Sequence, residues 1–448
     1  MIAYIAGVLF VAVGVAVSIA LHEVGHLVPA KKFGVKVTQY MVGFGPTIWS
    51  TRRGETEYGL KAIPLGGYIR MIGMFPPKAG DAPDRLRSSS TGRFSQLMDQ
   101  ARQDSMDEVG PADRDRVFYQ LSVPKKVTVM LGGPMMNFVI AAVLLTGIVT
   151  LYGIPVAQEG AVVVTVSECV VPAQGASKTA CAPTDPKTPA FVAGLRPGDK
   201  LVSIDGQKVT SSATLSDVVQ PRAGQPTDIV LERDGTQQTV TATPVKNTVA
   251  RIDAQGRPVQ GADGRPVTVD AGFLGVTSQT PTAMERQPVT AAPGYVGSLF
   301  VQTAGVIVKI PEKMVGTFQA AFGSGERDRN GPVSVVGVGR VGGEIASADL
   351  GAGGTLAKLV VLISLIASLN MALFVFNLVP LLPLDGGHVA GALWEGLKRR
   401  GAKLLGKADP GHVDVAKALP IAYTMAVLLI GMSALLIYAD IVKPISFL

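Results

Sequence analysis

Four long stretches of almost uncharged residues constrain the fold of this chain more than any other feature. They lie at Ile2–Leu21, Val127–Leu151, Leu356–Leu378 and Ala418–Ile437. A helix needs about 20 consecutive apolar residues to cross the hydrocarbon core of a bilayer, and each stretch is long enough. The mean hydropathy of +0.34 over 448 residues agrees with this interpretation. The sequence therefore predicts a polytopic α-helical membrane protein with four transmembrane helices.

The distribution of basic residues predicts how these helices are oriented. Clusters at helix ends that would share one side of the membrane are Lys31-Lys32, Lys125-Lys126 and Lys398-Arg399-Arg400. Because Lys and Arg are enriched in cytoplasmic loops, we expect residues 31–126 and 379–417 to be cytoplasmic. Residues 152–355 and both termini would then be extracytoplasmic. The net charge of +7 follows helix ends without interleaved aromatic residues, so nucleic acid is not an expected partner.

The segments between the helices differ in composition. Residues 31–76 alternate apolar and polar positions, as strands do, with a turn predicted at Arg53-Gly54. Residues 77–126 are predicted to be a flexible cytoplasmic insert, because the part up to 116 is rich in Pro, Ser, Asp and Arg and has little to bury. Residues 156–280 combine short strand patterns with tight turns, which predicts an extracytoplasmic α+β domain.

The end of the first apolar stretch carries the sequence HEVGH, in which His22, Glu23 and His26 are ionisable groups at membrane depth. Such groups are costly there and usually mark a functional site. Residues four apart lie on one face of a helix, so both histidines can bind one metal ion. Glu23 would lie near the open coordination position, where it can accept a proton from water. This H-E-x-x-H spacing is typical of zinc hydrolases. The alternative is a histidine pair hydrogen-bonded inside a helix bundle.

Catalytic zinc needs a third protein ligand. Asp385 is the single carboxylate in a long apolar run, between prolines and a Gly-Gly pair that let the backbone leave helical geometry. An ordinary turn at a helix end is the competing interpretation of Asp-Gly-Gly, and His388 is a weaker rival as ligand. The histidines and Asp385 can meet only if the first and third helices run in the same direction. We therefore expect the apolar stretch Gly294–Ile310, with Lys309 near its end, to be an amphipathic or interfacial helix and not a further crossing.

The two cysteines of the chain, Cys169 and Cys181, both fall in the predicted extracytoplasmic segment. Disulfides persist in oxidising compartments, so a bond between these two residues is predicted. Two unpaired cysteines are the alternative.

Five motifs occur in the order found in site-2 proteases: HEVGH (22–26), GFGP (43–46), IPLGGY (63–68), GGPMMNF (132–138) and NLVPLLPLDGGH (377–388). Over nearly its whole length the chain resembles the bacterial regulator-of-sigma-E protease branch of that family. The resemblance implies an intramembrane zinc (Zn²⁺) endopeptidase of the bacterial inner membrane, with its active site near the cytoplasmic side. His22, His26 and Asp385 would be the zinc ligands, and Glu23 would be the general base. Substrates would be single-span membrane proteins, such as anti-sigma factors, that another protease has already cut.

The resemblance also implies a substrate-binding region. Asn377 matches a position that contacts unwound substrate backbone, although an interhelical hydrogen bond is its simpler interpretation. Residues 35–72, with Gly66 and Gly67, match a membrane-associated β-element whose edge would pair with substrate. The sequence AGLRPGDKLVSIDG (193–206) resembles a PDZ domain, which would bind newly exposed chain ends or act only as a steric gate.

The predicted order of segments is a first transmembrane helix with the histidine motif (1–30), the β-element (31–76), the insert (77–126), a second transmembrane helix (127–152), the PDZ-like domain (156–280), an interfacial region (281–355), a third transmembrane helix with the Asp385 motif (356–390), and a cytoplasmic linker with the fourth helix (391–448).

Two other classes of function stay open. A non-catalytic membrane adaptor, with a structural metal or none, would have no use for Glu23. A metal transporter would need a continuous polar route, and the second and fourth helices contain few polar residues.

Overall fold

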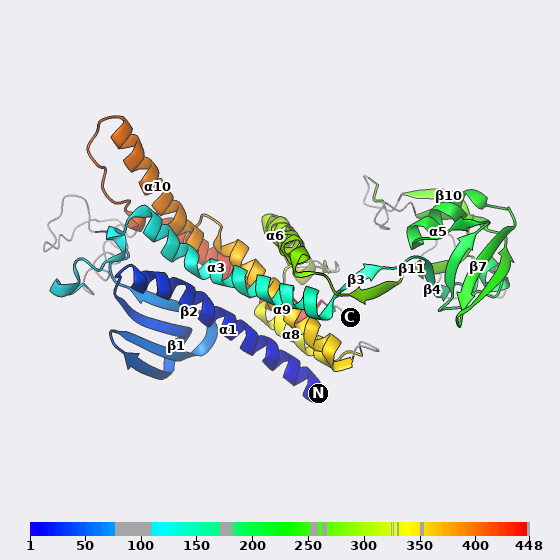
Figure 1. Cartoon of the computed structure of the whole chain (residues 1–448), viewed down its shortest axis with the longest axis horizontal. Coiled ribbons are helices and arrows are strands. Elements are labelled where there is room, and N and C mark those ends of the chain that lie inside the picture. The colour runs from blue at the N-terminus through cyan, green and yellow to red at the C-terminus, as the bar shows by residue number, and fades with distance from the viewer. Residues whose placement is uncertain are drawn as a thin grey trace. The chain divides into compact units, whose positions relative to one another are not determined.

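The computed structural model describes residues 1–76, 109–170, 181, 184–250, 259–261, 267–323, 325, 327–328, 331–349 and 354–445. They form two compact units, one made of Met1–Leu151 with Gln287–Leu448 and the other of Tyr152–Arg286. Figure 1 shows that the first unit is mainly helical and the second is rich in strands. The second unit is therefore an insertion in the chain of the first.

Four long apolar helices form the helical unit: α1 (Ile2–Lys32), α3 (Val123–Gly147), α9 (Gly354–Asn377) and α11 (Leu419–Val442). Each contains most or all of one predicted transmembrane stretch. α1 continues beyond the predicted end at Leu21 through the histidine motif and Pro29, and it ends at Lys32, shortly before Gly34, whose φ is +84°. A π-helical turn (Ile148–Tyr152) extends α3. The histidine motif thus lies on a continuous helix.

Glycines allow α1 and α3 to touch. A Cβ atom on Gly25 would lie 2.2 Å from the carbonyl oxygen of Gly132, and a Cβ on Gly132 would lie 2.0 Å from the carbonyl oxygen of Gly25. Only glycine permits so close an approach of two helix backbones. The contact brings the last turns of α1 against the first half of α3, and α3 also contacts α9 (Figure 1).

Four shorter helices complete the unit: α6 (Ala292–Val308), α7 (Ile310–Phe322), α8 (Val335–Ser347) and α10 (Asp385–Leu404). The stretch predicted to be interfacial forms α6, which together with the preceding 3₁₀ turn (Val289–Ala291) is long and apolar enough to cross a membrane. The described residues therefore contain five such helices by length and composition, where the sequence predicted four. α10 fills much of the region that the sequence predicted to be a linker.

Two strands, β1 (Val37–Arg53) and β2 (Thr56–Met71), form the predicted β-element. The turn between them includes Gly54, whose φ of +63° suits glycine. The first part of β1, residues 37–42, pairs with residues 67–71 on one side and residues 57–60 on the other. Tyr40 donates a hydrogen bond to the carbonyl oxygen of Ala20, 2.8 Å away, and so joins this sheet to α1.

Residues 77–108 of the predicted flexible insert lie outside the described residues. The structure therefore tests the predicted flexibility only for residues 109–126. Residues 109–122 fold against the sheet. Val117 and Phe118 are 3% and 6% exposed, and the Arg116 guanidinium donates to both carboxylate oxygens of Glu55 at 2.8 Å. The prediction of flexibility is therefore wrong for residues 109–126, since this part has apolar side chains to bury and α3 already begins at Val123.

The second unit contains ten of the described strands, of which β12 pairs with β3: β3 (Ile154–Ala157), β4 (Ala161–Val166), β5 (Lys200–Ile204), β6 (Gln207–Lys208), β7 (Thr227–Arg233), β8 (Thr236–Ala242), β9 (Val245–Ala250), β10 (Thr268–Phe273), β11 (Val276–Gln279) and β12 (Thr282–Glu285). Its main sheet has the order β11-β4-β5-β7-β8. Two helices, α4 (Pro189–Val192) and α5 (Ser212–Val219), enclose a core with Leu201, Ile204 and Leu231 fully buried.

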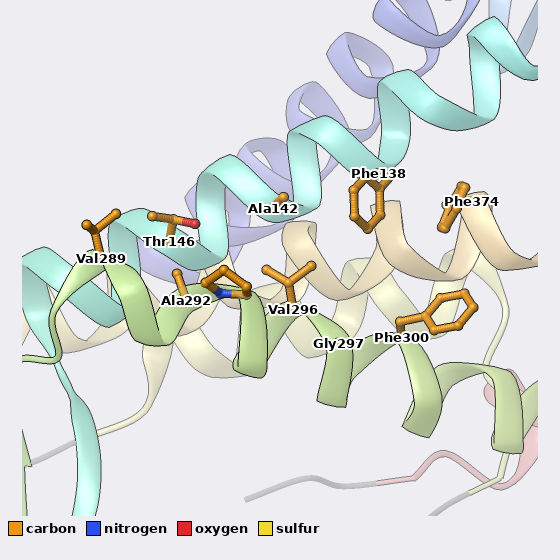
Figure 2. Close-up of a pocket in the computed structure, with 10 residues that line it drawn as sticks. Phe138, Ala142, Thr146, Val289, Ala292, Val296, Gly297, Phe300 and Phe374 are labelled. Atoms are coloured by element: carbon orange, nitrogen blue, oxygen red, sulfur yellow. The ribbon is translucent and has the colours of Figure 1, made fainter.

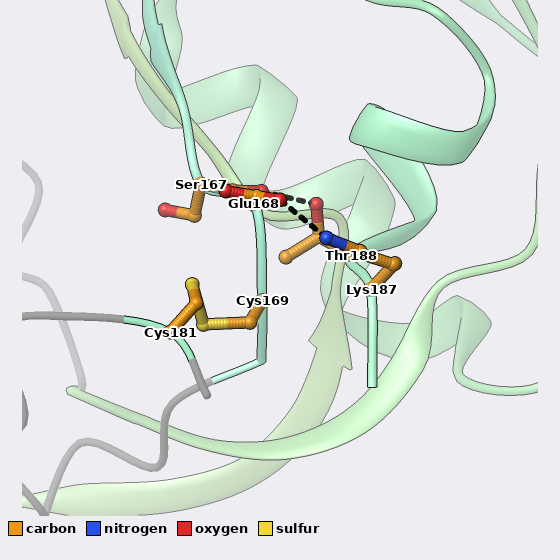
Figure 3. Close-up of a disulfide and its surroundings, with 6 residues drawn as sticks. All are labelled: Ser167, Glu168, Cys169, Cys181, Lys187 and Thr188. Atoms are coloured by element: carbon orange, nitrogen blue, oxygen red, sulfur yellow. Dashed lines mark hydrogen bonds and ion pairs between the residues drawn. A yellow bond between two sulfur atoms is a disulfide. The ribbon is translucent and has the colours of Figure 1, made fainter. Parts of the chain in front are cut away.

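The structure joins Cys169 to Cys181 by a disulfide (Figure 3). Beside it, Thr188 donates a hydrogen bond to the carbonyl oxygen of Ser167 and Lys187 pairs with Glu168. The bond is thus built into the end of β4, where the chain enters a segment outside the described residues.

Candidate metal centre

Three side chains from two distant parts of the chain converge in the helical unit. His22 and His26 lie one turn apart on α1, and their Nε2 atoms are 3.2 Å apart. Asp385 is the first residue of α10, and its Oδ2 atom lies 3.4 Å from each Nε2. Within the described residues, this is the one group of three or more His, Cys, Asp or Glu ligand atoms that could share a metal ion.

The connection between α9 and α10 brings Asp385 to the histidines. A Cβ atom on Gly386 would lie 2.3 Å from the carbonyl oxygen of Val379, and one on Gly387 would lie 2.6 Å from the backbone nitrogen of Leu382. The chain therefore folds back tightly against the first turn of α10, which requires both glycines. This geometry agrees with the expectation that helix breakers turn the carboxylate inward.

The spacing of these atoms fits zinc. Zinc binds His nitrogen and carboxylate oxygen at about 2.0–2.2 Å in tetrahedral sites, so two ligand atoms are about 3.3 Å apart. The observed separations are 3.2 and 3.4 Å. Gly133 on α3 leaves the necessary room, because a Cβ atom there would lie 2.1 Å from Nε2 of His26 and 2.7 Å from Nε2 of His22. Two histidines, one carboxylate and an open side are typical of a catalytic zinc site.

The outer nitrogens of both histidines contact α3. Nδ1 of His26 lies 2.8 Å from the carbonyl oxygen of Val129. Nδ1 of His22 lies 3.1 Å from the side-chain amide of Asn137, which is 1% exposed. No role was predicted for Asn137 from the sequence. Its signal was the position of an amide inside an apolar helix, within the motif GGPMMNF.

Glu23 is 8% exposed and points toward the β-element. A Cβ atom on Gly67 would lie 2.9 Å from Cγ of Glu23, and the backbone of Ile69 lies close to the Glu23 carboxylate. Gly66 has φ +116°, and a Cβ atom there would meet the ring of Phe44 at 2.5 Å. The Gly66-Gly67 pair thus allows the strand to pass directly beside the carboxylate.

The other two candidate residues, Asn377 and His388, lie on the helices at either end of this connection. Asn377 is the last residue of α9, is half-buried, and makes no side-chain hydrogen bond to another described residue. His388 lies one turn after Asp385 on α10, but the group of atoms that could hold a metal contains Asp385 and not His388.

A buried ion pair holds α10 against α3. Nζ of Lys126 lies 3.0 and 2.8 Å from the carboxylate oxygens of Glu395, and the side chains are 7% and 2% exposed. Burial would raise the pKa of Glu395, but the hydrogen bonds from Lys126 and the backbone N–H of Val413 hold it below its usual value. Nδ1 of His412 lies 3.3 Å from the same carboxylate. This cluster fixes the helix whose first residue is Asp385.

Apolar helices of membrane-spanning length that gather two histidines, an aspartate and a buried glutamate define a membrane protein of the metallohydrolase class. Comparison with known proteins identifies the family. The model of peptidase family M50 matches residues 10–407. The chain is 36% identical to the zinc metalloprotease Rip1 of Mycolicibacterium smegmatis over 449 residues, which are 98% of each chain.

Two further relatives agree. The chain is 34% identical to the zinc metalloprotease Rip1 of Mycobacterium tuberculosis over 446 residues, which cover 99% of this chain and 98% of that protein. It is 26% identical to the metalloprotease MmpA of Caulobacter vibrioides over 392 residues, which cover 86% and 85%. The chain therefore belongs to peptidase family M50, the site-2 protease family, and is a multi-pass membrane zinc metalloprotease. The family expected from the motifs is confirmed.

Proposed function

We propose that this protease cuts peptide bonds in or near the transmembrane segment of single-span membrane proteins. The observation that carries the proposal is the convergence of His22, His26 and Asp385 at the ends of apolar helices, with the buried carboxylate of Glu23 beside them. The site is built from α1 and the start of α10, so a peptide bond that lies within or beside the membrane can reach it.

His22, His26 and Asp385 would hold the zinc ion. When bound, zinc supplies Lewis acidity, which makes water nucleophilic near neutral pH and polarises the scissile carbonyl. Glu23 takes the proton from the attacking water and passes it to the departing amine nitrogen, which returns the carboxylate to its starting state. The neighbouring backbone of Ile69 would help to orient the Glu23 carboxylate for both transfers.

The β-element would hold the substrate extended. A helical substrate hides its peptide bonds in its own hydrogen bonds, so it must unwind before water can attack. Residues 67–71 pair with residues 37–42 along one edge, and Ile69 on the same segment faces Glu23. Addition of a substrate strand beside Gly66 and Gly67 would bring its carbonyls to the site. The half-buried amide of Asn377 would bind the backbone of the same strand.

We further propose four membrane crossings. Gln287 donates its backbone N–H to the carbonyl oxygen of Val149, 3.0 Å away, so the chain returns to the end of α3 from which it left. Figure 2 shows Val289 beside Thr146 at that end and Phe300 beside Phe374, deeper in the bundle, around an apolar cavity of about 630 Å³. α6 therefore starts where α3 ends and runs back along it.

α7 then returns the chain to the side from which it came. The ring of Phe322, at the end of α7, stacks on Tyr438 near the end of α11 with centroids 5.2 Å apart. α7 has 13 residues and spans about 20 Å, less than the ~30 Å of a bilayer core. α6 and α7 are thus better explained as a hairpin entering from one side. α9 then begins on the side where α3 ends, so α1 and α9 run in the same direction.

The basic clusters at residues 31–32, 125–126 and 398–400 favour a bacterial inner membrane topology with the metal site near the cytoplasmic side and both termini outside. Ile48 and Trp49, 67% and 60% exposed on β1, would contact lipid. We propose that the substrates resemble anti-sigma factors and arrive after another protease has removed their outer part.

The second unit would act as a PDZ-like domain that faces outward. A small cavity of about 170 Å³ lies between α5 and the start of β11, lined by Leu215, Val219 and Phe273 among others. Because β11 is at one end of the main sheet, an extended chain end could pair with it and place an apolar residue in this cavity. Such binding would favour substrates whose outer part is already removed.

The test is Glu23→Gln in the full chain, with cleavage of a co-expressed single-span reporter that lacks its outer domain. We expect the variant to retain about one zinc per chain and to lose cleavage, because the amide cannot accept the proton. Glu344→Gln is the matched control, since Glu344 pairs with Arg340 on α8 and should not affect cleavage. Undiminished cleavage by the Glu23→Gln variant would reject the proposed base. Absence of cleavage by the unmodified protein would favour the membrane adaptor.

A further inference from the structure

We propose that Asn137 is a positioning residue for the metal ligand His22. Its side-chain oxygen accepts the proton on Nδ1 of His22 and so leaves Nε2 unprotonated to bind the metal. The inference rests on the metal site proposed above. Asn137 itself is not one of the proposed metal ligands. The contact that carries it joins α3 to α1 at 3.1 Å.

His26 shows which kind of hydrogen-bond partner the Nδ1 atom of a ligand histidine needs. A backbone carbonyl can only accept a hydrogen bond, and the carbonyl oxygen of Val129 lies 2.8 Å from Nδ1 of His26. The neutral imidazole of His26 therefore carries its proton on Nδ1, and its Nε2 lone pair faces His22 and Asp385. The same arrangement at His22 requires an acceptor next to Nδ1.

The Asn137 amide is the polar group at that position. With its nitrogen toward Nδ1, the amide would donate, and His22 would have to carry its proton on Nε2, among the atoms that converge on the metal position. The oxygen of this amide is buried and has no hydrogen-bond partner among the described residues. The nitrogen and oxygen of an amide are nearly the same size, so rotation by 180° brings the oxygen onto Nδ1 in the same space. Only this orientation is compatible with metal binding by Nε2.

Burial restricts the movement of the Asn137 side chain beside His22. Asn137 is 1% exposed, and it lies one turn after Gly133, the residue against which both ligand nitrogens pack. α3 therefore contributes three contacts on one face: the Val129 carbonyl, the Gly133 surface and the Asn137 amide. Together they set the ring orientation of both histidines, which α1 alone would leave free to rotate about χ2.

The experiment compares zinc affinity in the purified full-length protein, measured by competition with a chromophoric chelator. We expect Asn137→Ala to weaken zinc binding about 10- to 100-fold, the usual effect of losing a hydrogen bond to a ligand histidine. Asn137→Asp supplies a carboxylate acceptor in the same place and should stay within about threefold of the unmodified protein. The absorption bands of the cobalt-substituted protein should change in the Ala variant and be retained in the Asp variant.

Asn370→Ala is the matched control. Asn370 is also 1% exposed and also has a buried side-chain oxygen without a partner among the described residues, but its amide donates to Ser18 and not to a ligand histidine. The Asn370→Ala substitution should leave zinc affinity unchanged. Equal affinity of the Asn137→Ala and unmodified proteins would overturn the inference while leaving the metal site intact. Weaker binding by Asn137→Asp than by Asn137→Ala would also overturn it. Absence of zinc binding by the unmodified protein would overturn the metal site itself.

Discussion

Substitution of Gly133 by alanine tests the geometry of the metal centre most sharply, because it adds one methyl group and removes no polar atom. A Cβ atom at this position would lie 2.1 Å from Nε2 of His26 and 2.7 Å from Nε2 of His22. Ordinary van der Waals contact begins at about 3.4 Å, so the His26 ring must move by more than ~1 Å. Movement of α3 away from α1 would also break the close backbone packing of Gly132 on Gly25.

The size of the effect follows from the tolerance of metal–ligand distances. These vary by only about 0.2 Å in a well-formed site, so a shift of more than ~1 Å removes His26 from coordination. We expect zinc affinity to fall at least ~100-fold, which is about 2.8 kcal/mol. Alanine favours helix more than glycine by up to ~1 kcal/mol, so the helix itself should not be weakened.

The assay is zinc affinity together with the thermal unfolding of the metal-free protein in detergent. Gly147→Ala is the control on the same helix, since a Cβ atom there meets nothing within 4 Å. We expect unchanged zinc affinity for Gly147→Ala and a specific loss for Gly133→Ala. Normal zinc binding by Gly133→Ala would refute the packing of the histidines against α3.

Two further predictions concern stability. Lys126→Met should destabilise the metal-free protein by about 3–5 kcal/mol in thermal unfolding, because it leaves the buried Glu395 carboxylate without its main partner, whereas the double variant with Glu395→Met should lose less. In the second unit, burial would raise the pKa of Asp199, but hydrogen bonds from Arg233 hold it below its ordinary range. The stability from this pair should therefore be present above the unfolded pKa of about 3.9 and decline as pH falls through the lower folded pKa. Hydrogen exchange in β5 and β7 should report this loss, and Asp199→Asn should have a flatter pH profile; an unchanged profile would contradict it.

Sequence patterns predicted the parts of this protein that local chemistry determines. Long apolar runs defined α1, α3, α9 and α11, since crossing a bilayer imposes length and hydropathy on each helix by itself. The H-E-x-x-H spacing placed two histidines on one helix face, because residues four apart on a helix point the same way. The glycine turn before Glu55 followed from backbone conformation alone.

What the sequence could not determine depends on packing between distant segments. The sequence favoured Asp385 over His388 as the third ligand, but the distance of 3.4 Å from Asp385 to both histidines depends on how α10 folds against α1. Asn137 could not be paired with His22 from the sequence, because the two residues are 115 positions apart on different helices. The path of α6 also depends on packing, because its apolar content alone does not distinguish a membrane crossing from a hairpin with α7.

X-ray absorption at the zinc edge, recorded on the purified full-length protein, measures the ligands of the metal directly. We expect one ion per chain, bound by two imidazole nitrogens and a carboxylate oxygen at about 2.0–2.2 Å, with one imidazole lost in His22→Ala and the carboxylate lost in Asp385→Ala. Zinc with a spectrum that neither substitution alters would contradict it, as would protein that is folded and active without zinc.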